Sequence, residues 1–209
     1  MQTILLADDH HLLRHGLRSL LEEDDFEVVA EASDGREAAR LARHLQPDIA
    51  ILDFSMPLMN GIEAARDIRT HAPATRMLLL TMYDEESYTM EGLHAGITGF
   101  VHKAQAARDL VLAIREVSRG TTYLNPKISK TLVDGFLYNL GWQRNPLSGR
   151  ERQVLQLVAE SNTTRRIAEI LGLSVKTADS HRSRIMQKLD IHDTAGLVRY
   201  AIRHGVIKL

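Results

Sequence analysis

Five short apolar runs alternate with helix-periodic segments over the first 120 residues, and this alternation restricts the fold more than any other feature of the chain. Strands that alternate with amphipathic helices are typical of a parallel sheet covered by helices on both faces. The pattern therefore predicts an α/β domain over residues 1–120, with a doubly wound sheet of five parallel strands. The predicted strands comprise residues 3–7, 27–31, 48–52, 77–80 and 99–101.

Turn-forming pairs interrupt this pattern after residue 120. Asn125-Pro126 and Asn145-Pro146 lie on either side of one amphipathic piece, residues 128–140. Because these pairs break regular structure, residues 121–146 are predicted to be a linker that carries one helix.

The rest of the chain, residues 147–209, contains four helical stretches and no strand-like run, which predicts an all-α domain of four helices. Each stretch follows a short polar residue that can accept hydrogen bonds from the unpaired amides of a first helical turn. These predicted caps are Ser148, Thr163 or Thr164, Ser174 and Asp193.

The chain contains no cysteine, which excludes disulfides, iron–sulfur clusters and thiol catalysis and suits a reducing cytoplasm. Its N-terminal apolar stretch is too short for a secretory signal and lacks a basic leader. No run approaches the ~20 apolar residues that a membrane span needs. We therefore expect a cytoplasmic protein without a membrane partner.

Charge is distributed unevenly along the chain. Residues 1–144 carry 15 basic and 21 acidic side chains, a net charge of −6, whereas residues 145–209 carry 11 and 6, a net charge of +5. This asymmetry predicts that the C-terminal domain faces a polyanion such as nucleic acid.

Polar side chains follow the predicted strands of the first domain at their carboxyl ends. Asp8 and Asp9 follow the first strand, Asp53 the third, Thr81 the fourth and Lys103 the fifth. Ligands of doubly wound sheets bind at this edge, so we expect the five side chains to gather there.

Three carboxylates placed together repel one another unless a cation joins them or their pKa values rise. A hard ion such as Mg²⁺ prefers oxygen ligands and leaves positions for phosphate oxygens. Asp53 can then attack an activated phosphoryl group, while Mg²⁺ and Lys103 offset its charge and Thr81 donates a hydrogen bond.

Four segments together resemble the receiver signature of bacterial response regulators: residues 4–10, 52–61, 80–82 and 99–103. The resemblance implies a flavodoxin-like receiver whose Asp53 accepts phosphate from a sensor histidine kinase. It also implies roles for other residues: Asp8, Asp9 and the Ser55 carbonyl around Mg²⁺, Thr81 and Lys103 on the phosphate, and Phe100 as a switch aromatic. The chain departs from the family in having Ala104 where many receivers have proline.

Residues 164–178 have the pattern of two helices joined by a tight turn, with the small Ala168 for close packing and Gly172 for a positive φ. In the second helix one side is predicted to face the core, through Val175, Ala178, Ile185 and Leu189. The opposite side suits the major groove of DNA. The candidate DNA contacts are Lys176, Thr177, Asp179, Ser180, Arg182, Ser183, Arg184, Gln187 and Lys188, of which Arg182 and Lys188 are expected to reach phosphates.

This region resembles the LuxR-type helix-turn-helix of the NarL/FixJ response regulators. The resemblance implies a recognition helix at residues 175–189, a dimerising helix at residues 193–203, and a homodimer when the protein is phosphorylated or bound to promoter DNA. Asp179 stands where many relatives have a basic residue, and Arg165-Arg166 adds charge, so the target sequence does not carry over from relatives.

Together the two resemblances identify the chain as a response regulator transcription factor and not as an enzyme, apart from removal of its own phosphate. A haloacid-dehalogenase-like phosphatase is an alternative, but that family needs a second aspartate where this chain has Ser55. Two further alternatives are a receiver that never turns over phosphate and a helix-turn-helix that contacts protein instead of DNA. The adjacent His10 and His11 are predicted to flank the acidic site without coordinating an ion.

Overall fold

The structure, a computed structural model, describes residues 1–82, 86–124, 128–129, 146–204 and 206–207. The chain forms two compact units, residues 1–140 and 141–209. The boundaries expected at residues 120 and 146 stay predictions. Among the described residues, no helix combines the length and the apolar character that crossing a membrane requires.

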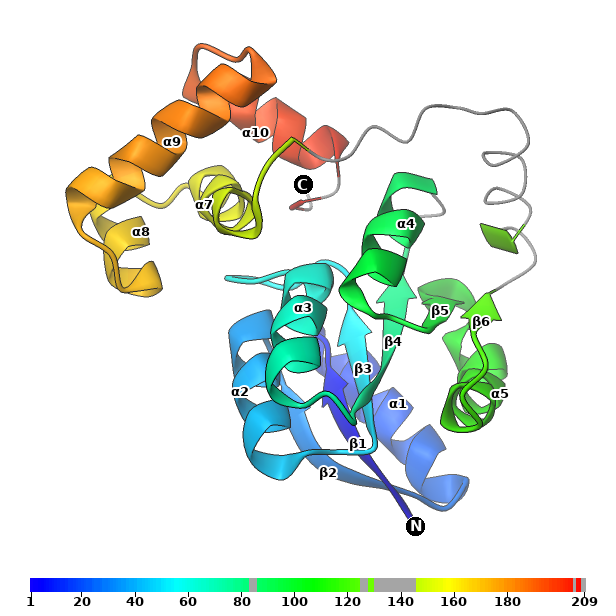
Figure 1. The fold of residues 1–209 in the computed structure, drawn as a ribbon. Coiled ribbons are helices and arrows are strands. Elements are labelled where there is room, and N and C mark those ends of the chain that lie inside the picture. Colours follow the sequence, from blue (N-terminus) through cyan, green and yellow to red (C-terminus); the bar gives the residue numbers. More distant parts are fainter. Residues whose placement is uncertain (83–85, 125–127, 130–145, 205, 208–209) are drawn as a thin grey trace. The chain divides into compact units, whose positions relative to one another are not determined.

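The N-terminal unit contains one parallel sheet with the strand order β2-β1-β3-β4-β5-β6 (Figure 1). This order reverses direction beside β1, which is the topology of a doubly wound fold, as predicted. Strands β3 and β4 read as continuous apolar runs because helices bury both of their faces. The strands are β1 (Gln2–Ala7), β2 (Phe26–Ala32), β3 (Ile49–Asp53), β4 (Arg76–Thr81), β5 (Gly99–His102) and β6 (Tyr123–Leu124).

The prediction of five strands was wrong by one, because β6 (Tyr123–Leu124) adds a sixth at the edge of the sheet. Its two residues pair in parallel with Gly99 and Phe100 of β5. The Tyr123 amide also donates to the Thr98 carbonyl, at 2.8 Å. A two-residue strand has too little periodicity to be detected, and its pairing depends on a neighbour far away in the sequence.

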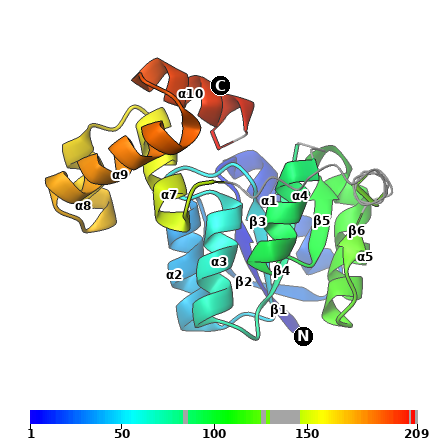
Figure 2. The same cartoon turned by 45° about the horizontal axis from the view of Figure 1, so that its top comes forward.

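Helices cover both faces of the sheet (Figure 2). One face packs against α1 and α5, and the other packs against α2, α3 and α4. The helices are α1 (His11–Glu23), α2 (Gly35–Leu45), α3 (Gly61–His71), α4 (Glu86–Ala95) and α5 (Ala106–Ser118), with a short 3₁₀ helix, η1 (Lys103–Gln105), before α5.

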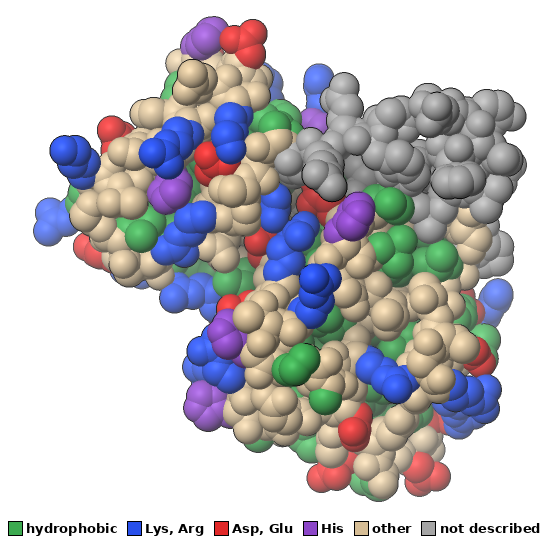
Figure 3. Space-filling view, in the orientation of Figure 1, with side chains coloured by type: hydrophobic (Ala, Val, Ile, Leu, Met, Phe, Trp, Pro, Cys, Tyr) green, Lys and Arg blue, Asp and Glu red, His purple; other side chains and the backbone are tan. Residues whose placement is uncertain are grey.

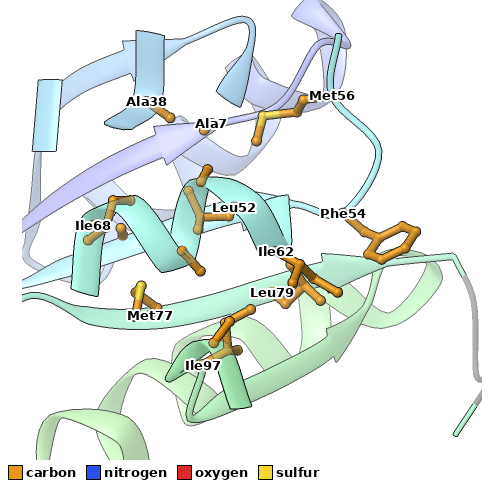
Figure 4. Close-up of a cluster of buried hydrophobic side chains, with 14 of the residues drawn as sticks. Ala7, Ala38, Leu52, Phe54, Met56, Ile62, Ile68, Met77, Leu79 and Ile97 are labelled. Atoms are coloured by element: carbon orange, nitrogen blue, oxygen red, sulfur yellow. The ribbon is translucent and has the colours of Figure 1, made fainter. Parts of the chain in front are cut away.

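Side chains of the central strands alternate between the two faces and so build two separate cores. Leu52 and Leu79 pack against α2 and α3, as Figure 4 shows, whereas Ile51 and Leu78 face α1 and α5. The first of these cores also buries Ile128, which is 1% exposed. The linker helix predicted at residues 128–140 lies largely outside the described residues, although Ile128 and Ser129 are helical.

The C-terminal unit consists of the four predicted helices, α7 (Gly149–Ala159), α8 (Thr164–Leu171), α9 (Val175–Leu189) and α10 (Thr194–Arg203). Each begins after a capping side chain that accepts a hydrogen bond from a first-turn amide. The caps are Ser148, Thr163, Ser174 and Asp193, which confirms the predicted starts. Gly172 ends α8 with φ 64°, so the tight turn of the helix-turn-helix forms as expected.

Two glycines provide a matched test of the packing in the N-terminal unit. A Cβ atom at Gly35, the first residue of α2, would lie 1.9 Å from the Met59 carbonyl oxygen, whereas one at Gly16 in α1 would meet nothing within 4 Å. Gly35→Ala should therefore lower the free energy of unfolding by about 1–3 kcal/mol. Gly16→Ala should raise it by about 0.5–1 kcal/mol, because glycine is unfavourable inside a helix. Urea unfolding monitored by circular dichroism measures both, and equal effects of the two substitutions would contradict the packing of α2 on the Met59 loop.

Candidate functional site

Two acidic side chains end adjacent central strands of the sheet. Asp8 follows β1 and Asp53 ends β3, and these strands pair in parallel between Ile4–Ala7 and Ile49–Leu52. The strand order reverses at this pair, which is the place where doubly wound sheets bind their ligands. Both residues are buried, with Asp8 0% and Asp53 1% exposed.

Lys103 connects these two carboxylates. Its Nζ lies 2.6 Å from Asp8 Oδ2 and 2.9 Å from Asp53 Oδ2, and its side chain is only 6% exposed. Burial alone would lower the pKa of Lys103, but the charges and hydrogen bonds of Asp53 and Asp8 outweigh burial and raise this pKa above its usual value. The side chain is thus a fixed cation at neutral pH, as the sequence predicted.

Asp9 and His10 complete a compact set of potential metal ligands. One ligand atom from each of Asp8, Asp9, His10 and Asp53 lies within 4.8 Å of the others. Carboxylate oxygens in this arrangement suit a hard divalent cation, so the residues fit Mg²⁺. The structure thereby brings together the predicted acidic residues and adds His10, whose ring had been expected only to flank them.

The neighbouring loop holds the Asp53 carboxylate in place. The Ser55 amide donates to Asp53 Oδ1 at 3.2 Å, and the Phe54 amide donates to the Leu80 carbonyl at 2.8 Å. Asn60 caps α3 by accepting from the Glu63 amide. The loop after β3 is therefore pinned both to β4 and to the start of α3.

Thr81 and Phe100, the two predicted switch residues, are buried on neighbouring strands, with 4% and 1% exposure. Thr81 ends β4 and pairs with His102 of β5. The Phe100 ring packs on α4, where a Cβ atom at Gly92 would lie 2.7 Å from it. The peptide bond between Lys103 and Ala104 is trans, since no cis bond occurs among the described residues.

Sequence reasoning missed two side chains that support this site. Arg14 of α1 donates to the Asp8 carbonyl at 2.6 Å and to Glu31 at 2.8 Å. His102 caps η1 by accepting from the Ala104 amide at 3.2 Å, which positions the turn that carries Lys103. Neither residue belongs to a recognisable spacing pattern, since each acts through contacts made only in the folded chain.

The second candidate site is the outward side of α9. Of the nine predicted contact residues, all except Arg182 are exposed, and Arg182 is half-buried. Ala178 and Ile185 are buried on the opposite side, at 1% and 0% exposure. The prediction that Val175 faces the core was wrong, because this residue is 50% exposed in the first turn of α9, before the first buried position.

Two cationic side chains of this surface, Lys188 and Arg182, contact other residues of the C-terminal unit. Lys188 Nζ lies 2.7 Å from Glu151 Oε2, and Arg182 donates to the Thr194 hydroxyl. Burial raises the pKa of Glu151, but hydrogen bonds from Lys188 and Ser148 outweigh burial and lower it below the usual value. By contrast, Lys176 and Arg184 have no ion pair among the described residues. Lys and Arg side chains are prominent over α8 and α9 on the face shown in Figure 3.

Both units match known protein families. Residues 4–115 match the response regulator receiver domain, and residues 145–201 match the bacterial regulatory proteins of the luxR family. The chain belongs to the LuxR-type response regulators.

Relatives of this response regulator resemble it over nearly its whole length. Oxygen regulatory protein NreC of Staphylococcus carnosus (strain TM300) is 40% identical over 213 residues, which cover 98% of each chain. RcsB from Salmonella enterica serovar Typhimurium, bound to promoter rprA with the phosphomimetic BeF₃⁻, is 28% identical with a TM-score of 0.67 and covers 95% of this chain and 97% of its own. A structure of two RcsB dimers bound to two parallel DNAs gives 28% identity and a TM-score of 0.58, over 95% and 96% of the respective chains.

The family matches bear on the alternatives left open by the sequence. A receiver joined to a LuxR-type domain is a transcription regulator, and phosphorylation-driven regulation is typical of this family. The response regulator is accordingly a transcription factor whose receiver controls a DNA-binding unit.

Lys103 is predicted to be the largest single contributor to stability at the acidic site. Lys103→Met leaves two buried carboxylates without their cation and should lower the free energy of unfolding at pH 7 by about 3–5 kcal/mol. Because the folded pKa of Lys103 is raised, its contribution is fully present below the unfolded value of about 10.4 and is lost as pH rises through the folded pKa. Added Mg²⁺ should restore part of the loss, since a ligand of the native state stabilises it.

Urea unfolding with and without Mg²⁺ measures these effects. Lys176→Met, on the exposed side of α9, is the matched control and should leave unfolding of the receiver unchanged. An unaltered unfolding midpoint in Lys103→Met would refute the role given to this cation.

Proposed function

We propose that Asp53 accepts a phosphoryl group from a sensor histidine kinase and that this modification controls dimerisation and sequence-specific DNA binding. The observation that carries the proposal is the buried Asp53 carboxylate beside Lys103, 2.9 Å away, at the switch point of the sheet. A carboxylate that faces one ammonium and further acidic ligands is suited to take up a phosphoryl group together with a divalent cation.

In the transfer step an Asp53 oxygen attacks the phosphorus, the P–O bond forms, and the bond to the kinase histidine nitrogen breaks. Lys103 stays protonated, so its charge offsets the negative charge on the phosphoryl oxygens. The Thr81 hydroxyl donates a hydrogen bond to one of them. Asp8, Asp9, Asp53 and the Ser55 carbonyl would hold Mg²⁺, which supplies further positive charge when it is bound.

The strand pairing supports a route from this site toward the linker proposed for residues 121–146. Thr81 ends β4 opposite His102 of β5, and Phe100 lies two residues earlier on β5, opposite Leu79 of β4. Phe100 in turn pairs with Leu124 of β6, and Ile128 is buried in the same core as Phe100. A shift of Thr81 and Phe100 toward the phosphoryl group therefore disturbs the residues that lead out of the receiver.

The C-terminal unit is proposed to bind promoter DNA through α9, with α10 as the dimer contact. The exposed polar side of α9, the net charge of +5 over residues 145–209 and the DNA complexes of RcsB support this proposal. A dimer would read two half-sites about one helical turn apart. The protein would hydrolyse only one phosphate compound, the aspartyl phosphate formed on its own Asp53.

Asp53→Asn should abolish phosphate incorporation from acetyl phosphate with Mg²⁺, because an amide oxygen is a poor nucleophile and adds no negative charge to the site. Intact-protein mass spectrometry measures the incorporation. Asp25→Asn is the matched control, since Asp25 is exposed and its φ of 63° is well tolerated by asparagine. Wild-type levels of phosphate on Asp53→Asn, or none on the wild type, would contradict the assignment.

Arg184→Ala should weaken binding to a selected DNA site by about 1–3 kcal/mol, because an exposed arginine on the reading side of α9 can bond two acceptors of guanine. Fluorescence anisotropy at fixed salt, with beryllofluoride-treated protein, measures this change. Arg119→Ala at the end of α5 removes the same charge from the receiver and serves as the control. Equal affinities of the two variants would rule out a base contact by Arg184.

A further inference from the structure

We propose that His10 Nδ1 is a direct ligand of the metal ion in the acidic site, which gives this receiver a higher affinity for first-row transition ions, relative to Mg²⁺, than oxygen ligands alone provide. The inference rests on the proposed function, because it concerns the same ion site. It assigns to His10 a role in choosing which divalent ion accompanies phosphorylation.

The distances around His10 match the edges of a coordination octahedron. His10 Nδ1 lies 2.8 Å from Asp9 Oδ1 and 3.2 Å from Asp8 Oδ1. Neighbouring ligands at bond lengths of roughly 2.1 Å in an octahedron lie about 3.0 Å apart. Together with the Asp53 carboxylate, all four ligand atoms lie within 4.8 Å of one another. Ligands on opposite sides of such an ion lie about 4.2 Å apart, so side-chain shifts of a few tenths of an ångström bring all four to one ion.

Backbone contacts direct the His10 ring into this position. The His10 amide donates to Asp8 Oδ1 at 2.8 Å, so the turn that starts α1 folds over the carboxylate. His10 is the residue before α1, but its side chain makes no capping hydrogen bond to the helix. The ring is therefore committed to the two carboxylates and not to the start of α1.

A second observation at the site points to a ligand. The Ser55 side chain is nine-tenths buried, at 6% exposure, and its hydroxyl has no hydrogen-bond partner among the described residues. Ser55 adjoins the ion site, because its amide contacts Asp53 Oδ1. A buried hydroxyl without a partner is costly, so a molecule or ion with its water shell is expected beside it.

The chemistry of the donor set determines the preference. Mg²⁺ is bound almost entirely by oxygen, whereas imidazole nitrogen suits ions later in the first transition series. A neutral imidazole offers one nitrogen as a ligand and keeps its proton on the other. One nitrogen among three carboxylates therefore raises the affinity for Co²⁺ more than the affinity for Mg²⁺.

The test is calorimetric titration of the full-length protein with Co²⁺ and with Mg²⁺. In His10→Ala the ratio of Co²⁺ affinity to Mg²⁺ affinity should fall about tenfold or more, because even residues that only support a ligand change metal affinity by this factor. The adjacent exposed His11 gives the matched control, and His11→Ala should leave the ratio unchanged. His10→Gln keeps the size and polarity of the side chain, removes the imidazole, and should lower the ratio as His10→Ala does.

Pulsed electron paramagnetic resonance of bound Mn²⁺ provides a readout that a structural role would not produce. The wild type and His11→Ala should show coupling to an imidazole nitrogen, and His10→Ala should not. An unchanged affinity ratio, or no nitrogen coupling in the wild type, would overturn the role of His10 while Asp53 phosphorylation with Mg²⁺ still held. Phosphorylation of wild-type Asp53 that does not depend on Mg²⁺ or any other divalent ion, in contrast, would remove the proposed ion site itself.

Discussion

The contact of one buried ammonium with two buried carboxylates is the interaction on which the receiver depends. Lys103 lies within 3 Å of both Asp8 and Asp53, and all three side chains are buried. Removing the cation would leave like charges in a medium of low polarity, which costs far more than an exposed ion pair contributes. The same arrangement supports the proposed function, because fixed charge that is largely shielded from solvent can stabilise a transferred phosphoryl group.

The parallel sheet makes this contact possible. Asp8, Asp53 and Lys103 come from the ends of β1, β3 and β5, and parallel pairing brings these ends to one edge. The same pairing connects the site to the rest of the chain, since β5 lies between Thr81 on β4 and Leu124 on β6. The proposed phosphoryl transfer and the proposed signal transmission thus use one set of strands.

In the C-terminal unit a similar ion pair limits the DNA-binding surface. Glu151 completes the capping box of α7 with Ser148 and also binds Lys188 of α9 at 2.7 Å. This pair joins the first helix of the unit to the reading helix, and it occupies a cation that the sequence had assigned to phosphate. Among the side chains proposed to contact DNA, Lys176 and Arg184 are exposed cations of α9 that have no ion pair among the described residues.

Local signals in the sequence determined the strands, the helix starts and the identity of the acidic site. Apolar runs such as residues 77–80 and caps such as Ser174 act over a few residues, so they can be recognised without the fold. Only the tertiary structure decided the sixth strand, the exposure of Val175, the supporting contacts of Arg14 and the place of His10 among the potential metal ligands. Each of these depends on distances between residues that periodicity does not specify, because a pairing partner or a coordination edge is defined in space and not along the chain.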